Sequence, residues 1–290
     1  MDIDFVVPWV DGNDPAWLEE KRKYEPDKEL IFGGKNRYRD WDLMRYWFRG
    51  VETFAPWVRN VFFVSWGHVP AFLNTNAPKL NIVKHTDFIP PSYLPTFNSR
   101  SIELNIHRIP GLSDHFVYFN DDIFFLKPAL PEHFFRNGLP CSCGIERAHP
   151  ILSYPTVNAH DHANCMGIIN MHFNKQQQIS RFRGKYISRQ YNWKQNVRTY
   201  MLEKLYSYGF VGFQNHHGPA AFLKESFMEI WEAEERALDA SCMEKFRSSK
   251  QVSQFLVQWW KLPAVRFHHR SLTMPSSLFQ TARSKQSPVQ

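Results

Sequence analysis

Short apolar runs alternate with longer amphipathic stretches through the first half of the chain. The apolar runs have the length of buried strands and lie at residues 3–10, 60–66, 80–84 and 115–120, with a short extended piece at 123–127. Residues 40–55 and 98–109 instead place apolar side chains at helical spacing, which predicts two helices that each bury one face. Strands that alternate with helices indicate an α/β fold with a Rossmann-like, mostly parallel sheet.

The pattern changes after about residue 140, where Pro, Asn and His are scattered through an irregular stretch up to about residue 192. Helical spacing returns at 194–207, 220–238 and 249–261. We therefore expect an α/β half at residues 1–140, a helical and looped half at 141–275 that covers the sheet, and a loose tail at 276–290.

Each predicted strand of the first half runs directly into a cluster of polar residues. The clusters are Asp11 to Asp14, Ser65 to His68, His85 to Asp87, and Asn120 to Asp122. In open parallel sheets, ligands bind at the carboxyl ends of the strands. We therefore expect the four clusters to converge on one crevice.

The Asn120-Asp121-Asp122 segment carries the sharpest chemical signal of the four clusters. Two neighbouring carboxylates at the end of an apolar strand repel each other and lose hydration, and a divalent cation relieves both penalties. Oxygen ligands of this kind suit Mg²⁺ or Mn²⁺, which predicts a metal site at Asp121 and Asp122. The alternative is an ordinary hairpin turn, because Asn and Asp favour turns.

Glu103 lies on the predicted helix that directly precedes this strand. Its carboxylate could act as general base on an attacking hydroxyl. It could equally pair with Arg108 or another cation, and the sequence leaves both roles open.

The segment after the first strand also admits two interpretations. Asp11, Gly12 and Asn13 could form a ligand-binding loop, in which the glycine lets the backbone come close to the ligand. The same residues suit a strand-to-helix turn in which Asp14 is the N-cap and Pro15 occupies the first helical position. The two interpretations are compatible.

Three further cationic side chains precede predicted helices and could bind phosphate charge: Arg39, His217 and Arg247. Nothing in their spacing requires this role, and a solvated surface is the commoner position for such side chains. The histidines at 160–162 and 268–269 have no third ligand at a suitable spacing, so we assign no metal site to them.

The net charge of +7 indicates a polyanionic partner. A nucleotide diphosphate, a phosphorylated polymer, nucleic acid and an anionic membrane surface would each satisfy this charge. The absence of any run of five or six like charges argues against a nucleic-acid-binding tail. Aromatic residues make up 16% of the chain, which suits either a carbohydrate site or an aromatic core.

The expected location is the cytoplasm, with the inner face of the membrane as a second option. The chain starts without a basic leader or apolar stretch, and no window reaches the roughly 18 to 20 apolar residues of a membrane span. The four cysteines include no CxxC pair, which favours free thiols over a zinc site.

Longer blocks of the sequence match a known pattern. They are IDFVVPWVDGND at 3–14 and residues 37–74 and 94–128, the latter ending in HFVYFNDDIFFLKP. The first resembles the opening block, and the other two resemble the second block, of the Stealth family of hexose-1-phosphate transferases. HHGPAAFLKES at 216–226 and MEKFRSSKQVSQFLVQWW at 243–260 are similar to the third. The usual fourth block near the C-terminus is not found, and MPSSLF at 274–279 matches its close only in part.

The resemblance implies a transferase of capsule or exopolysaccharide synthesis. It would move N-acetylhexosamine-1-phosphate or a related group from a UDP-sugar to a glycan hydroxyl, with a divalent cation and with UMP as leaving group. It also implies that Asp122 is a metal or donor ligand, that Glu103 is an active-site carboxylate, and that His217 and Arg247 lie on the phosphate side.

Under this hypothesis the 1–140 half binds the nucleotide sugar, and Asp11, Gly12, Asn13, Arg39 and Asn120 contact it. The 141–275 half then completes the active site. Two other functions stay open: a metal-dependent glycosyltransferase, which would release UDP, and a non-catalytic carbohydrate-binding module.

Overall fold

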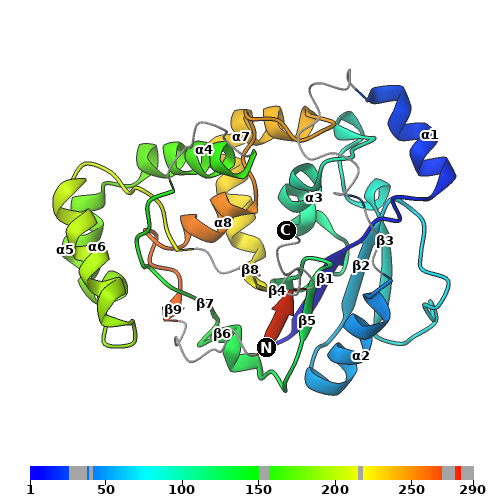
Figure 1. Cartoon of the computed structure of the whole chain (residues 1–290), viewed down its shortest axis with the longest axis horizontal. Helices are drawn as coiled ribbons and strands as arrows, with labels where there is room; N and C mark the ends of the chain where they lie inside the picture. The colour runs from blue at the N-terminus through cyan, green and yellow to red at the C-terminus, as the bar shows by residue number, and fades with distance from the viewer. Residues whose placement is uncertain (26–37, 39–41, 150–156, 215–217, 270–277, 282–290) are drawn as a thin grey trace, which may run out of the picture.

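The computed structural model describes residues 1–25, 38, 42–149, 157–214, 218–269 and 278–281 (Figure 1). Its centre is a five-stranded sheet in the order β3-β2-β1-β4-β8. The first four positions are parallel and comprise β1 (Ile3–Pro8), β2 (Val61–Ser65), β3 (Leu80–Lys84) and β4 (His115–Tyr118). The expected α/β fold with a mostly parallel sheet is confirmed.

The sheet is buried on both faces, which explains the continuous apolar runs of its strands. In β1, Ile3, Phe5 and Val7 belong to a core cluster that contains Trp47 of α2 (Met44–Phe54). Val6, which points to the opposite face, belongs to a second cluster with Leu104 of α3 (Ser99–Asn105). Helix α1 (Pro15–Tyr24) follows β1 directly.

Several short elements connect these strands and helices. They are the 3₁₀ turns η3 (His85–Asp87), η4 (Pro91–Tyr93), η5 (Ile106–Arg108) and η6 (Pro131–His133), and the strands β5 (Ile123–Phe125), β6 (Phe135–Arg136), β7 (Leu139–Ser142) and β9 (His268–His269).

Strand β8 (Ala220–Leu223) corrects the helix expected over 220–238. Its four residues pair antiparallel with β4, where Tyr118 is the partner of Ala220. Helix α7 begins only afterwards and extends farther, from Lys224 to Met243. The open edge of β4 offers unpaired backbone groups to this segment, and satisfying them outweighs the local helical preference.

Two helices occupy most of the stretch that was expected to be irregular: α4 (Val157–His172) and α5 (Lys175–Tyr186). The polar residues that suggested loops bind other segments from the sides of α4. Asn164 donates to the backbone carbonyls of Ser249 and Gln251 at 2.9 and 2.8 Å. The expectation of an irregular stretch was therefore wrong there, because these polar groups satisfy tertiary contacts instead of ending a helix.

The remaining helices are α6 (Trp193–Leu205) and α8 (Gln254–Trp260), close to their expected positions. Residues of both predicted halves share one core cluster, which includes Phe116 of β4, Ile169 of α4 and Trp259 of α8. Within the described residues, no helix is long and apolar enough to cross a membrane.

Part of the expected loose tail is ordered against the sheet. Strand β10 (Phe279–Thr281) pairs antiparallel with β5. The ring of Phe279 lies 5.0 Å from that of Phe125 and 6.2 Å from that of Phe119, measured between centroids. Burial of this aromatic ring anchors the segment, so the expectation was wrong for residues 279–281.

Candidate active site at the carboxyl edge of the sheet

The clusters after β1 and β2 are in direct contact. The backbone N–H of Asp11 donates to His68 Nε2 at 3.0 Å, and His68 Nδ1 lies 3.8 Å from a carboxylate oxygen of Asp14. Burial lowers the pKa of His68, against the opposing attraction of Asp14 and Asp11. The imidazole is therefore held in its neutral form between the two loops.

The cluster after β3 adjoins the same group through His85. This side chain is only 7% exposed, and burial, followed by the charge of His68, lowers its pKa from 6.5 to about 4. Its Nδ1 atom is buried and has no hydrogen-bond partner among the described residues. The clusters after β1 and β2 thus meet as the sequence predicts, and convergence of all four clusters stays a prediction.

Because of His85, the free energy of unfolding is expected to fall in mild acid. Because its folded-state pKa of about 4 lies below the ordinary 6.5, the unfolded chain takes up a proton first, and stability present above pH 6.5 is lost as the pH falls toward 4. Between about pH 7 and about pH 5 this histidine alone should reduce the free energy of unfolding by about 2 kcal/mol. Urea denaturation of the wild type and His85→Gln across this range tests it, and equal pH slopes would contradict it.

The fourth cluster directly follows Tyr118, which is the last residue of β4. Its hydroxyl donates to Glu103 Oε1 at 3.5 Å. Burial raises the pKa of Tyr118 well above its usual value, the negative charges of Glu103 and Asp121 raise it further, and Arg100 and Arg247 oppose them. Two acidic and two basic side chains from distant parts of the chain therefore act on one phenol at the end of the strand.

The Asn120-Asp121-Asp122 segment forms a turn between β4 and β5, in which the Ile123 N–H donates to the Asn120 carbonyl at 3.2 Å. Asp121 is exposed, while Asp122 is half-buried with its Oδ1 atom shielded from solvent. The turn and the metal-site interpretations are therefore compatible.

These side chains have the right chemistry for Mg²⁺ or Mn²⁺. Within the described part of the chain, no group of three or more His, Cys, Asp or Glu could hold a metal ion alone. Mg²⁺ in phosphate sites commonly takes only one or two carboxylates and completes its shell with water and phosphate oxygens. Binding of a cation by Asp121 and Asp122 stays a prediction.

Glu103 is fixed by a buried ion-pair network. The side chain is 3% exposed, and its Oε2 lies 3.3 Å from Arg100 Nη1. Arg100 Nη2 lies 2.9 Å from an oxygen of Asp161 on α4, which is 1% exposed. The cation beside Glu103 is thus Arg100, whereas Arg108 is exposed and its guanidinium carbon lies 4.8 Å from the Trp231 ring centroid.

Asp161 and its partner Arg100 are among the residues near Glu103 that the sequence analysis did not select. Asp161 was considered only as part of a metal motif at 160–162, and the arginine that it pairs with lies far away in the sequence. Burial raises the pKa of Asp161, and the charge of Arg100 opposes that shift. No local pattern marks such a pair, because only the packing of α4 against the first half brings the two together.

Arg247 lies at the start of α3. Its Nη2 donates to Ser99 Oγ at 2.6 Å, and the neighbouring Phe246 stacks on Phe97 with 5.4 Å between ring centroids. The Asn98 side chain caps α3 and donates to the Glu244 carbonyl at 3.0 Å. These contacts bring the predicted phosphate-side arginine to the helix that carries Glu103.

The loop after β1 is shaped by protein contacts. Asp14 caps α1 by accepting from the Trp17 N–H at 2.7 Å, and Asp11 Oδ1 accepts from the Asn13 N–H at 2.9 Å. A Cβ at Gly12 would lie 2.0 Å from the Tyr38 carbonyl oxygen, so the glycine permits this close approach. The N-cap prediction is confirmed, while contact of the loop with a nucleotide stays a prediction.

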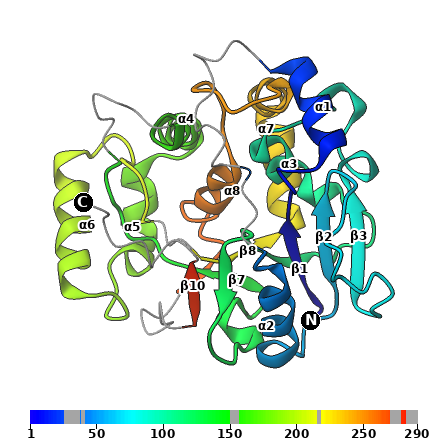
Figure 2. The same ribbon diagram turned by 45° about the vertical axis from the view of Figure 1, so that its right-hand side comes forward.

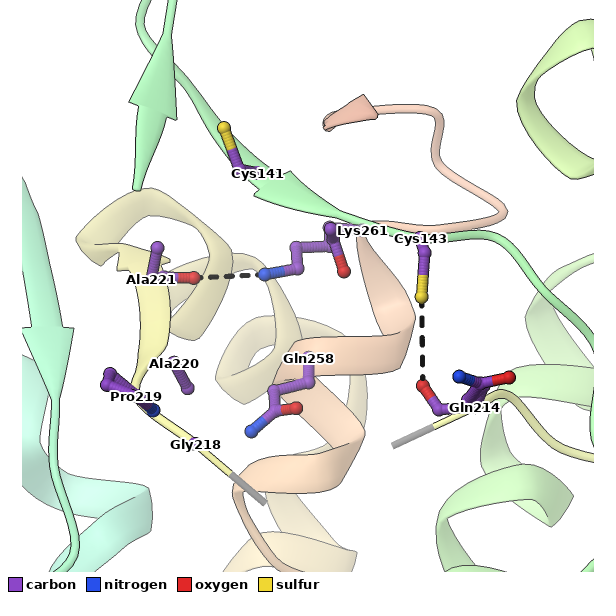
Figure 3. A pocket seen from close by; sticks show the side chains of 10 residues that line it. Cys141, Cys143, Gln214, Gly218, Pro219, Ala220, Ala221, Gln258 and Lys261 are labelled. Atoms are coloured by element: carbon purple, nitrogen blue, oxygen red, sulfur yellow. Dashed lines mark hydrogen bonds between the residues drawn. The ribbon is translucent and has the colours of Figure 1, made fainter. Parts of the chain in front are cut away.

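Arg39 and His217 lie outside the described residues, so their predicted roles stay predictions. A polar pocket adjoins the start of β8, in the space between β7, β8 and α8 (Figure 3). It contains Lys261, whose ammonium donates to the Ala221 carbonyl at 2.9 Å, and the side chain of Gln258. No sequence pattern predicted this pocket.

Comparison with known proteins identifies relatives of this chain. Residues 1–29 match the family model described as Stealth protein conserved region 1, and residues 37–141 match that of conserved region 2.

Relatives with known roles align over most of the chain. The capsular polysaccharide phosphotransferase WcwK of Streptococcus pneumoniae is 42% identical over 93% of this chain and 80% of its own length. The receptor polysaccharide phosphotransferase WefC of Streptococcus gordonii is 38% identical over 91% and 79%. The exopolysaccharide phosphotransferase cps2G of Lactiplantibacillus plantarum is 36% identical over 93% and 78%.

Proposed function

Because the chain belongs to the Stealth family, we propose that it transfers a sugar-1-phosphate group from a UDP-sugar to a glycan hydroxyl in capsule or exopolysaccharide synthesis. Its relatives are phosphotransferases, and the chain is an enzyme of the same type. The transferred group is N-acetylhexosamine-1-phosphate or a close analogue, and UMP leaves. The observation that carries the proposal is the position of Glu103, which lies 3.5 Å from the Tyr118 hydroxyl and 3.3 Å from Arg100, on the helix whose Ser99 accepts from Arg247 at 2.6 Å.

The donor binds across the carboxyl edge of β1 and β4. Asp11, Gly12, Asn13, Arg39 and Asn120 contact the nucleotide sugar. Asp121 and Asp122 would hold Mg²⁺ or Mn²⁺, which when bound neutralises charge on the diphosphate.

The acceptor hydroxyl attacks the phosphorus that carries the sugar, and the bond from this phosphorus to the bridging oxygen breaks as UMP leaves. Glu103 or His217 takes the hydroxyl proton. Arg247 and His217 bind the non-bridging oxygens of the transferred group, where charge accumulates. Phosphoryl transfer depends chiefly on positioning and electrostatics, so these groups suffice chemically.

Arg100 and Asp161 act as positioning residues for Glu103. The guanidinium spans both carboxylates at 3.3 and 2.9 Å, which restrains the rotamer of Glu103 and compensates its buried charge. Residues that hold a catalytic side chain in this way keep it within the narrow geometry that transfer requires.

Product analysis tests the proposal directly. The protein is incubated with a panel of UDP-sugars, Mg²⁺ and candidate oligosaccharides, and the released nucleotide is identified by mass spectrometry. We expect UMP together with a phosphodiester-linked glycan, and chelation of the cation should abolish both. Release of UDP would instead indicate a glycosyltransferase, and glycan binding without turnover or cation dependence would indicate a binding module.

A further inference from the structure

Helix α6 has its polar and apolar faces reversed with respect to the protein interior. Its inward residues are polar: Thr199 Oγ1 accepts from the Glu146 N–H at 3.2 Å, and Asn196 donates to the Ser188 carbonyl at 2.8 Å. Arg198 Nε donates to the Glu146 carbonyl at 3.0 Å. An ordinary surface helix of a globular protein buries its apolar stripe instead.

All apolar side chains of α6 except Leu202, which is half-buried, point away from the protein. They are Trp193 (68% exposed), Val197 (48%), Tyr200 (47%), Met201 (54%) and Leu205 (66%). Their spacing of i, i+4, i+7, i+8 and i+12 places them on one face of the helix, which we call the α6 face. A contiguous exposed apolar surface of this kind marks an interaction site.

The positive charge of the molecule is concentrated in α5, α6 and the turn between them. Residues 175–205 contain eight basic side chains and only one acidic side chain, Glu203, so the segment carries 8 − 1 = +7. The whole chain carries 35 − 28 = +7 over the same complete sequence, so the remainder is neutral on balance. The basic residues are Lys175, Arg181, Arg183, Lys185, Arg189, Lys194, Arg198 and Lys204.

Several of these cations lie beside the α6 face itself. The ammonium of Lys194 lies 5.6 Å from the Trp193 ring centroid, and that of Lys204 lies 5.6 Å from the Tyr200 ring centroid. Both lysines are exposed, as are Arg181 and Arg189. Lys175 is buried and pairs with Glu146 at 2.9 Å, while Lys185 and Arg198 are half-buried and donate to the carbonyls of Phe267 and Glu146.

Helices α5 and α6 lie at the end of the molecule away from β2 and β3 in both views (Figures 1 and 2). In Figure 2, α6 is the outermost element at that end. The face is therefore accessible to an extended flat surface.

We propose that the α6 face docks on an anionic phospholipid surface. Exposed aromatic and aliphatic side chains bordered by lysine and arginine have the composition of an interfacial helix, which inserts its apolar side chains among lipid head groups. The basic residues add electrostatic attraction to anionic lipids. A second copy of the chain fits poorly, because a two-fold contact would bring two segments of charge +7 together.

Flotation with lipid vesicles tests this proposal independently of the transfer reaction. The full chain is mixed with vesicles of phosphatidylcholine, with or without phosphatidylglycerol, and floated through a density gradient. We expect the wild type to float with the phosphatidylglycerol vesicles and to partition at least about tenfold less onto phosphatidylcholine alone. High salt should weaken the binding, because the attraction is screened.

Two variants separate the apolar and the charged contributions. Trp193→Ser/Tyr200→Ser/Leu205→Ser removes exposed apolar groups, and Lys194→Glu/Lys204→Glu reverses two charges. Each should reduce partition by about tenfold or more. Thermal melts should stay close to that of the wild type, because the replaced apolar side chains are at least 47% exposed.

Matched controls replace equivalent side chains elsewhere on the surface. Met228→Ser/Met243→Ser/Leu130→Ser removes apolar groups that are 62%, 51% and 53% exposed, and Lys127→Glu/Arg236→Glu makes the same change in charge. Both should float like the wild type. The proposal is overturned if the wild type does not float, if the controls lose binding as the α6 variants do, or if light scattering shows a dimer that only the α6 variants dissociate.

Discussion

Asp122→Asn is expected to lower the turnover of sugar-phosphate transfer by at least about 10²-fold, as removal of one charge-stabilising group commonly does. The replacement keeps the shape of the side chain and removes one negative charge from the turn after β4. Asp122 is half-buried with a shielded oxygen, so solvent compensates this loss less than it would at an open surface. The affinity for the cation should fall together with turnover.

Two further variants serve as controls for Asp122→Asn. Asp114→Asn changes an exposed carboxylate just before β4, at the opposite end of the strand, and should leave turnover unchanged. Asp121→Asn, at an exposed position, should have the smaller effect of the two turn residues. Mn²⁺ binding followed by electron paramagnetic resonance gives a readout besides activity. Near-normal transfer by Asp122→Asn would refute the metal assignment.

Arg100→Met is expected to reduce the free energy of unfolding by about 3–5 kcal/mol, because it leaves buried carboxylates without their cation. Both carboxylates that Arg100 contacts, on Glu103 and Asp161, are at most 3% exposed. The surviving folded enzyme should also turn over slowly, since Glu103 loses the group that restrains it. Urea denaturation and steady-state kinetics measure the two effects separately.

Arg59→Met serves as the matched control. Arg59 Nε donates to Asp4 Oδ1 at 2.8 Å, and Asp4 is fully buried near the amino end of β1, away from the candidate site. This variant should also be destabilised while its turnover is retained. The double variant Arg100→Met/Asp161→Asn should recover part of the lost stability, because one of the two stranded charges is removed. Equal turnover of Arg100→Met and Arg59→Met would rule out a positioning role for Arg100.

The local sequence pattern predicted the four strands of the parallel sheet, with their ends correct to within a few residues. The reason is that β1, β2 and β4 are almost wholly buried, so continuous apolar runs such as 3–8 have few other stable arrangements. Contact between the loops after β1 and β2, through Asp11 and His68, followed from the same logic. Strands that run in parallel bring their carboxyl ends to one edge.

Pairings across long sequence separations could not be predicted. The local pattern of residues 220–223 predicts a helix, but they form strand β8 because they pair with the open edge of β4. The local pattern around Phe279 predicts a tail, but this residue packs against Phe125. In each case the stabilising free energy comes from contact with a segment far away in the sequence. The intrinsic helix or loop preference of the local residues is weaker than this contribution.

The sequence by itself determined which segments are strands and helices in the first half, which polar clusters end the strands, and the family to which the chain belongs. Only the tertiary structure decided that Arg100 joins Glu103 to Asp161, and that the apolar side of α6 faces outward. The spacing of apolar residues along the chain shows that a helix has an apolar face, because the helical repeat is a local property. Whether that face packs against the protein or is exposed depends on elements that folding brings from distant parts of the sequence.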